Sequence, residues 1–138
     1  LVEIIVSKSG SVDSKTTARA IQRFYDLGIR PDWWKLEPAA DAETWANIER
    51  VIVSNDPHCR GVVLLGLSSP QDELVQSFAP AARMDIVKGF AVGRTIFNDA
   101  AALWFKGEID NEQAVEALSS NLGVLVEAWR RAKKARTR

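Results

Sequence analysis

Short apolar runs and longer amphipathic stretches alternate four times along this 138-residue chain. Runs rich in β-branched and aromatic residues are typical of strands. The stretches between them repeat apolar residues at the three- and four-residue spacing of a helix. We predict strands over residues 2–6, 33–36, 62–65 and 86–92, and helices over residues 13–27, 41–54, 70–78, 95–105 and 111–134. Asp110 is the expected N-cap of the final helix.

These repeated units place the chain in the α/β class, with parallel strands joined by right-handed crossovers. Two architectures fit: an open doubly wound sheet, and the C-terminal half of a (β/α)₈ TIM barrel. Charged residues favour the half barrel, because Glu3, Lys35 and Glu37 lie within or at the ends of strands. A barrel interior would give them partners. We expect a single partial domain over residues 1–138, cut from a longer protein because it begins inside an apolar run without Met.

Composition narrows the class of protein further. Hydrophobic residues make up 46% of the chain and charged residues 26%, as in globular proteins. Basic and acidic side chains number 18 each, so no overall field attracts nucleic acid or an anionic membrane. A single Cys excludes an internal disulfide and favours a cytoplasmic location. No apolar run is long enough to cross a bilayer.

The basic residues are concentrated at the end of the chain. Six of them lie within residues 130–138, a segment without an acidic side chain. Cations are favourable at the carboxyl end of a helix, and no aromatic residue accompanies them here. We therefore interpret this basic tail as a solvated helix end rather than as a nucleic-acid-binding arm.

Lys35 is the first candidate for chemistry. It lies in a predicted strand beside Trp33, Trp34 and Leu36, which would provide apolar surroundings. Desolvation favours the neutral amine, which is the nucleophile that forms a Schiff base with a carbonyl substrate. Glu37 follows two residues later on the same side and could hold or relay a proton. The alternative is a structural Lys–Glu pair at the end of a strand.

Glu3 is the second candidate, since a carboxylate in the first apolar strand could act as a general acid or base. The alternative is a residue at a frayed strand end. Two glycine turns follow later strands and open helices, and they contain Gly66, Ser68, Gly93 and Arg94. Such turns bind anions through backbone N–H groups, and Arg94 adds a bidentate phosphate donor. The alternative is that these glycines serve only to let the chain turn and bind no ligand.

Other reactive or aromatic residues are interpreted as structural. His58 and Cys59 precede the third strand, and no second His or Cys is present to complete a closed zinc site. Trp45, Trp104 and Trp129 lie on predicted helices with apolar neighbours, so we expect all three in the core.

Three segments carry a resemblance to a known family. Residues 23–38 read RFYDLGIRPDWWKLEP, and residues 55–67 and 89–97 extend the similarity. They resemble the aldolase-like domain that follows a sugar kinase in bacterial inositol-catabolism proteins of the 5-dehydro-2-deoxygluconokinase type. That domain is in turn similar to the class I tagatose-1,6-bisphosphate aldolases. The resemblance covers nearly the whole chain, whereas nothing in the chain matches the kinase.

The resemblance implies a role for each candidate. In those aldolases the sixth barrel strand carries the Schiff-base lysine in a Lys-Val-Glu sequence, which Lys35-Leu36-Glu37 matches. Glu3 corresponds to a fifth-strand glutamate that assists proton transfer. The turns at residues 66–68 and 93–94 match the phosphate site. The sequence lacks the first four barrel strands, so the further substrate contacts that they supply in the family are in doubt for this chain.

The implied reaction is the cleavage of a phosphorylated 5-dehydro-2-deoxygluconate to dihydroxyacetone phosphate and malonate semialdehyde. The resemblance implies no cofactor and no metal ion, because the protonated imine acts as the electron sink. Expected partners are the small phosphorylated keto-sugar acid, the missing N-terminal barrel half and the kinase domain. Half a barrel leaves two strand edges unpaired, so we also expect self-association of the isolated chain. The alternative is a non-catalytic module that binds a sugar phosphate or drives oligomerisation of a sugar kinase.

Overall fold

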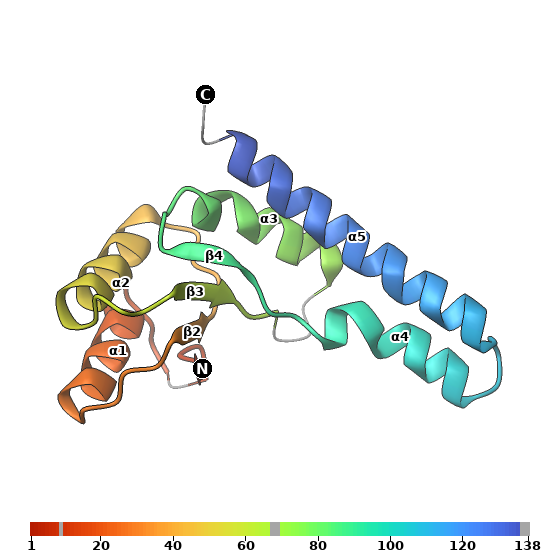
Figure 1. The fold of residues 1–138 in the computed structure, drawn as a ribbon, viewed down its shortest axis with the longest axis horizontal. Coiled ribbons are helices and arrows are strands. Elements are labelled where there is room, and N and C mark those ends of the chain that lie inside the picture. The colour runs from red at the N-terminus through yellow and green to blue at the C-terminus, as the bar shows by residue number, and fades with distance from the viewer. Residues whose placement is uncertain (9, 67–69, 136–138) are drawn as a thin grey trace.

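The computed structural model describes residues 1–8, 10–66 and 70–135. Within them the chain alternates strands and helices, as Figure 1 shows, and the predicted α/β class is confirmed. The strands are β1 (Val2–Ile4), β2 (Trp33–Leu36), β3 (Gly61–Leu64) and β4 (Val87–Phe90). The helices are α1 (Thr16–Asp26), α2 (Ala42–Asn55), α3 (Gln71–Ala82), α4 (Arg94–Phe105) and α5 (Asn111–Ala135).

The described strands form one parallel sheet in the order β1-β2-β3-β4. A doubly wound sheet reverses its strand order at a switch point, and this sequential order contains no reversal. The described strands are therefore compatible with half of a barrel. Its register sets Glu3 opposite Lys35, Lys35 opposite Val63, and Val63 opposite Gly89.

One face of the sheet is buried beneath helices. Figure 1 shows α1 and α2 on one side of the strands and α3 and α5 above them. Alternate strand residues point into this core, because successive side chains in a strand face opposite sides. The strand residues of the core are Ile4, Trp34, Leu36, Val62, Leu64 and Val87. Helix residues packed in the same cluster are Ile21, Tyr25, Trp45, Ile48, Ile52, Leu74, Phe78 and Leu125.

A β-bulge between β3 and β4 adjusts the last strand to this core. Val62 pairs with Val87 and Val63 pairs with Gly89, so Lys88 is the extra residue. The bulge lets Val87 and Phe90 face the core although they are three residues apart. Phe90 stacks on Phe78 of α3, with 5.1 Å between ring centroids. Without the bulge, simple alternation would turn Phe90 to the other face.

Side-chain caps begin two of the helices. Asp41 accepts a hydrogen bond from the backbone N–H of Thr44 at 2.7 Å and caps α2. Asp110 accepts from the N–H of Gln113 at 2.8 Å, and Gln113 accepts from the N–H of Asp110 at 3.0 Å. This reciprocal pair confirms the predicted cap of α5. Helix α3 continues to Ala82, past its predicted end at residue 78, although Pro80 in its last turn has no N–H to donate.

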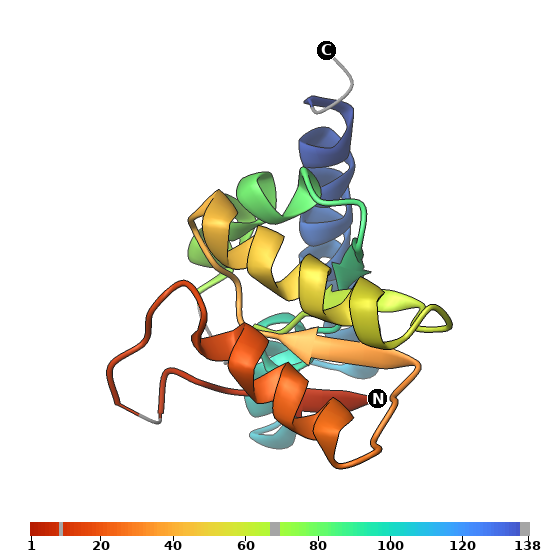
Figure 2. The same cartoon turned by 90° about the vertical axis from the view of Figure 1, so that its left-hand side faces the viewer.

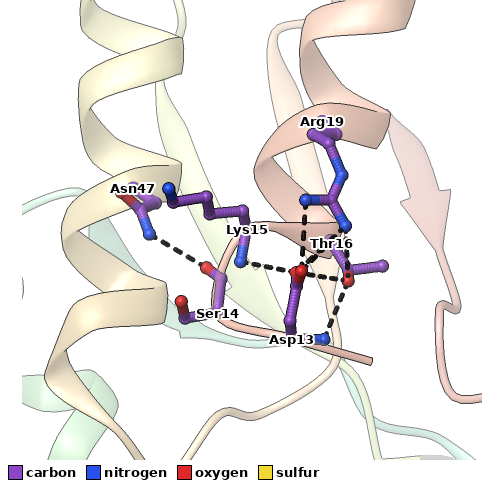
Figure 3. A network of polar contacts seen from close by, with 6 residues as sticks. All are labelled: Asp13, Ser14, Lys15, Thr16, Arg19 and Asn47. Atoms are coloured by element: carbon purple, nitrogen blue, oxygen red, sulfur yellow. Dashed lines mark hydrogen bonds and ion pairs between the residues drawn. The ribbon is translucent and has the colours of Figure 1, made fainter. Parts of the chain in front are cut away.

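The start of α1 is fixed by a polar network, shown in Figure 3. The Asp13 carboxylate accepts from the Thr16 hydroxyl at 2.7 Å and from the Arg19 guanidinium at 3.0 Å. The hydrogen bond from Thr16 is the main reason that the pKa of Asp13 lies below its ordinary value. Asn47 of α2 donates to the carbonyl of Ser14 at 3.1 Å. The network therefore ties α1 to α2, which lie side by side in Figure 2.

Helices α4 and α5 form a long hairpin that projects from the sheet (Figure 1). Helix α4 contacts α5, whose C-terminal part packs on α3 through Trp129, and Ala100 is the buried residue of α4. Trp45 lies in the core and Trp129 packs against it, as predicted. The prediction for Trp104 is wrong: its side chain is 43% exposed on the hairpin, and Phe105 is 80% exposed. None of the described helices is long and apolar enough to span a bilayer.

Tyr25 is the only tyrosine in the chain and lies in the core. The indole N–H of Trp34 donates to its hydroxyl at 3.0 Å. Burial raises the pKa of Tyr25 to about 12. The neutral phenol is therefore favoured in the folded state. Its contribution to stability is complete below pH 10, where an unfolded tyrosine begins to ionise, and is lost as the pH rises from about 10 to about 12.

We expect the tyrosinate absorbance of the folded protein to appear with a midpoint near pH 12, and near pH 10 in concentrated urea. The measurement is a titration at 295 nm with circular dichroism to monitor folding, and Tyr25→Phe supplies the blank. The same variant leaves the buried indole N–H of Trp34 without its acceptor, which we expect to cost about 1–3 kcal/mol in urea unfolding. Ionisation near pH 10 with native circular dichroism would contradict the burial argument.

Candidate active site

A cavity of about 250 Å³ lies on the open face of the sheet, at the carboxyl ends of the strands. This is the end at which ligands bind in parallel α/β folds. Each strand or the loop after it contributes lining residues: Glu3 and Lys8 from β1 and its loop, Lys35 from β2, Gly66 after β3, and Gly93 and Arg94 after β4. The structure thus brings together five of the residues singled out in the sequence, from four separate segments.

Lys35 and Glu3 form an ion pair at the centre of this arrangement. The Lys35 ammonium nitrogen lies 2.6 Å from Oε2 of Glu3. Their strands pair in the register that sets the two residues directly opposite each other. The side chains are 25% and 39% exposed, so both reach the cavity. An ion pair this accessible contributes at most about 1 kcal/mol to stability. Chemically, it places a carboxylate where it can accept a proton from the amine.

The surroundings of Lys35 are less apolar than its sequence neighbours suggest. Trp34 and Leu36 are fully buried, but they lie on the opposite, helix-covered face of the sheet. The open face instead gives Lys35 the neighbours Glu3 and Val63 in the same register row. The charged group in contact with this amine is therefore the Glu3 carboxylate.

The N-terminus of α4 faces the same cavity. Gly93 precedes the helix and Arg94 is its first residue, and both line the cavity. Backbone N–H groups at a helix N-terminus, together with the positive end of the helix dipole, favour an anion. The exposed guanidinium of Arg94 can add a pair of parallel hydrogen bonds to a phosphate. This end of the cavity is suited to an oxyanion.

Gly66 is buried where the chain leaves β3. A Cβ atom at this position would lie 2.9 Å from Cγ1 of Val92, which is closer than real Cβ atoms approach a neighbour. A larger residue here would therefore force the Val92 side chain, in the loop after β4, to shift. Ser68, the other residue predicted in this turn, lies outside the described residues.

Glu37 does not line the cavity that holds Lys35. Its carboxylate accepts hydrogen bonds from the backbone N–H groups of Val6 at 2.6 Å and Ser7 at 2.9 Å, and from the Ser7 hydroxyl. These contacts fasten the chain after β1 to the end of β2. Glu37 thus holds in place the segment between Glu3 and Lys8. Both of its carboxylate oxygens accept hydrogen bonds from that segment.

Lys8 and Phe97 line the cavity but were not singled out in the sequence. Lys8 follows β1 in a Ser-Lys-Ser-Gly turn, and only its place after the strand could have indicated a role. His58 and Cys59 lie in the loop before β3, at the opposite end of the strands from the cavity. Burial raises the pKa of the Cys59 thiol. Within the described residues, no group of three His, Cys, Asp or Glu side chains could hold a metal ion.

A family model described as an uncharacterised protein conserved in bacteria, DUF2090, matches residues 1–133. The chain belongs to this family. No curated protein and no solved structure matches it. The DUF2090 match spans the whole sheet and every described residue of the cavity, from Glu3 to Phe97.

The Glu37 contacts give a test of how the site is held in this DUF2090 chain. An Ala side chain at position 37 has no acceptor oxygen, so Glu37→Ala leaves the backbone N–H groups of Val6 and Ser7 without their side-chain partner. We expect a loss of about 1–2 kcal/mol in urea unfolding and faster hydrogen exchange at the amides of Val6 and Ser7. Glu116→Ala, on the exposed side of α5, is the control and should change neither. Equal exchange in both variants would show that Glu37 does not fasten this segment.

Proposed function

We propose that the chain is the lyase part of a class I aldolase, which cleaves a carbon–carbon bond through a Schiff base on Lys35. The observation that carries the proposal is the 2.6 Å pair of Lys35 and Glu3 in a cavity that Arg94 also lines. An amine nucleophile, a proton acceptor and an anion-binding helix end are the three components that such a reaction on a phosphorylated ketone needs.

The fold proposed for the complete protein is a (β/α)₈ barrel of which this chain is the C-terminal half. Three observations support this: the sequential parallel strand order, the helices packed on one face, and polar side chains gathered on the other face at the carboxyl ends. In a closed barrel the open face would become the interior. The missing N-terminal barrel half would then cover the cavity and supply further contacts to the substrate.

The proposed reaction forms an imine, breaks the carbon–carbon bond and then hydrolyses a second imine. Glu3 accepts a proton from Lys35, and the free amine attacks the ketone carbon. Loss of water then leaves a protonated imine. A carboxylate removes the proton of the hydroxyl on the β-carbon, the carbon–carbon bond breaks, and its electron pair moves into the imine to form an enamine. The aldehyde product departs, the enamine carbon takes up a proton, and water hydrolyses the new imine to release the second product and the amine.

The substrate that we propose is a phosphorylated 5-dehydro-2-deoxygluconate, made by a sugar kinase in the same cytoplasmic protein. Its cleavage would give dihydroxyacetone phosphate and malonate semialdehyde. The resemblance of residues 23–38 to the aldolase-like domain of inositol-catabolism proteins supports this choice. The phosphate, one carbon from the ketone, would lie at Gly93 and Arg94.

Reduction with borohydride tests the Schiff base. Incubation of the full-length protein with dihydroxyacetone phosphate and sodium borohydride should attach one reduced triose phosphate to Lys35, seen as a mass increase on the peptide that contains it. Lys35→Arg should abolish the adduct, and Lys88→Arg, on strand β4 of the same sheet, should leave it unchanged. No adduct on Lys35 in the wild-type protein would overturn the mechanism.

A second candidate function is supported by the hairpin. Its α4 and α5 helices border an apolar hollow of about 390 Å³, lined by Phe97, Trp104, Phe105, Val115 and Leu118 among others. Apolar surfaces of this kind mark sites of association. This candidate is a non-catalytic oligomerisation module whose partner is a second copy of the chain, since closed two-fold dimers are the commonest soluble assemblies.

Self-association is directly measurable. We expect the isolated chain to form dimers in light scattering after gel filtration, and Phe105→Glu to shift it to monomers because a charge cannot be buried in an apolar interface. Glu108→Gln, in the exposed turn of the hairpin, is the control. A well-folded wild-type monomer at micromolar concentration would contradict association.

The variant Lys35→Ala decides between the two candidate functions. If it leaves sugar-acid cleavage by the full-length protein unchanged, the oligomerisation module replaces the aldolase as the proposed function.

A further inference from the structure

Two cations line the cavity without an ion-pair partner. Among the described residues, neither Lys8 nor Arg94 has a carboxylate within ion-pair distance, whereas Lys35 is paired with Glu3. The cavity lining thus carries three basic side chains and one acidic one. Residues 1–129 as a whole carry 12 basic and 18 acidic side chains. The cavity is a positive region on a negative body, which favours an anionic ligand.

The order of the strands places these two cations on opposite sides of the reactive amine. Lys8 follows β1, Lys35 belongs to β2, and Arg94 follows β4. A ligand whose carbonyl carbon meets Lys35 therefore has one free cation toward the β1 edge and another toward the β4 edge. A substrate with a single anionic group would leave one of them unused.

The two cations also differ in what they bind well. Arg94 stands at a helix N-terminus, where a guanidinium and backbone N–H groups together surround a phosphate. Lys8 is a single ammonium on a flexible stem in an exposed loop, and it offers a point charge that a carboxylate can meet. The fastening of Val6 and Ser7 by Glu37 limits how far the Lys8 backbone can move from the cavity.

We propose that Lys8 is a specificity-determining residue that binds a carboxylate at the end of the substrate opposite the phosphate. This inference rests on the proposed function and defines its substrate class: a keto acid phosphate with one anionic group on each side of the ketone. Glu3 lies on the same side of Lys35 as Lys8. The bond that breaks would then lie between the ketone and the carboxylate, where Glu3 can reach the hydroxyl proton.

Two probes separate the roles of Lys8 and Lys35. Phosphorylated 5-dehydro-2-deoxygluconate carries both anionic groups, and dihydroxyacetone phosphate carries the phosphate alone. In the full-length protein, we expect Lys8→Gln to raise KM for the keto acid phosphate about ten-fold or more with kcat within two-fold. Borohydride trapping of dihydroxyacetone phosphate on Lys35 should stay at the wild-type level. Lys8→Arg should restore KM, and Lys106→Gln, in the turn after α4, is the matched control.

Binding in a Lys35→Gln background, where no imine can form, tests Lys8 apart from the chemistry. Calorimetry with the keto acid phosphate should show a Kd about ten-fold weaker when Lys8→Gln is added. An unchanged Kd and KM would overturn the role of Lys8 even if trapping succeeds. Equal weakening of dihydroxyacetone phosphate trapping would overturn it too, because the contact would not be to the carboxylate. A weaker Kd without any trapping in the wild type would overturn the Schiff base and leave Lys8 as an anion-binding residue.

Discussion

The pairing register of β1 and β2 determines what this molecule can present on its open face. Because side chains alternate along a strand, the register that buries Ile4 and Leu36 beneath helices also turns Glu3 and Lys35 outward and opposite each other. A shift of one residue would move the apolar side chains to solvent and the charged ones into the core. Burial of the core face thus fixes the ion pair without requiring that the pair itself be strongly stabilising.

Glu37 reinforces this register at the place where regular pairing ends. The strand β1 stops at Ile4, yet the Glu37 carboxylate binds the next backbone N–H groups, at Val6 and Ser7. The Glu37 side chain thus continues, beyond the end of β1, the hydrogen bonding that the main chains of β1 and β2 make within the sheet. The loop that contains Lys8 therefore begins at a segment that Glu37 holds in place. In this way a residue just after β2 positions the part of the cavity wall that follows β1.

Much of the fold was predictable because each element has a local cause. Apolar periodicity gave the type and order of the elements, and the side chain of Asp110 predicted the start of α5. The exposure of Trp104 was not predictable from its helix, since an apolar helical face indicates burial but not whether a partner is present. Whether Trp104 has a packing partner depends on the outward placement of the α4–α5 hairpin. That placement depends in turn on how all the helices pack against the sheet.

The candidate site was predictable as far as strand alternation extends. Glu3 and Lys35 lie within paired strands, so their shared face follows from counting residues. Glu37 lies one residue beyond the end of β2 and just before Pro38, where alternation no longer applies, and its side chain turns to the neighbouring loop instead. The loop residue Lys8 has no periodic signal at all. Its place in the lining of the same cavity as Arg94 depends on the path of the chain after β1 and on the arrangement of the whole sheet.

Helix α4 contributes residues to both the cavity and the apolar hollow, and Phe97 lines both. Its first residues, Arg94 and Thr95, line the cavity, while Trp104 and Phe105 at its far end border the apolar hollow. Twelve residues make a rod of about 18 Å, so a tilt of about ten degrees at one end displaces the other by about 3 Å. A ligand or partner that fixed the aromatic end of this helix would therefore also limit the movement of the Arg94 side chain at its other end.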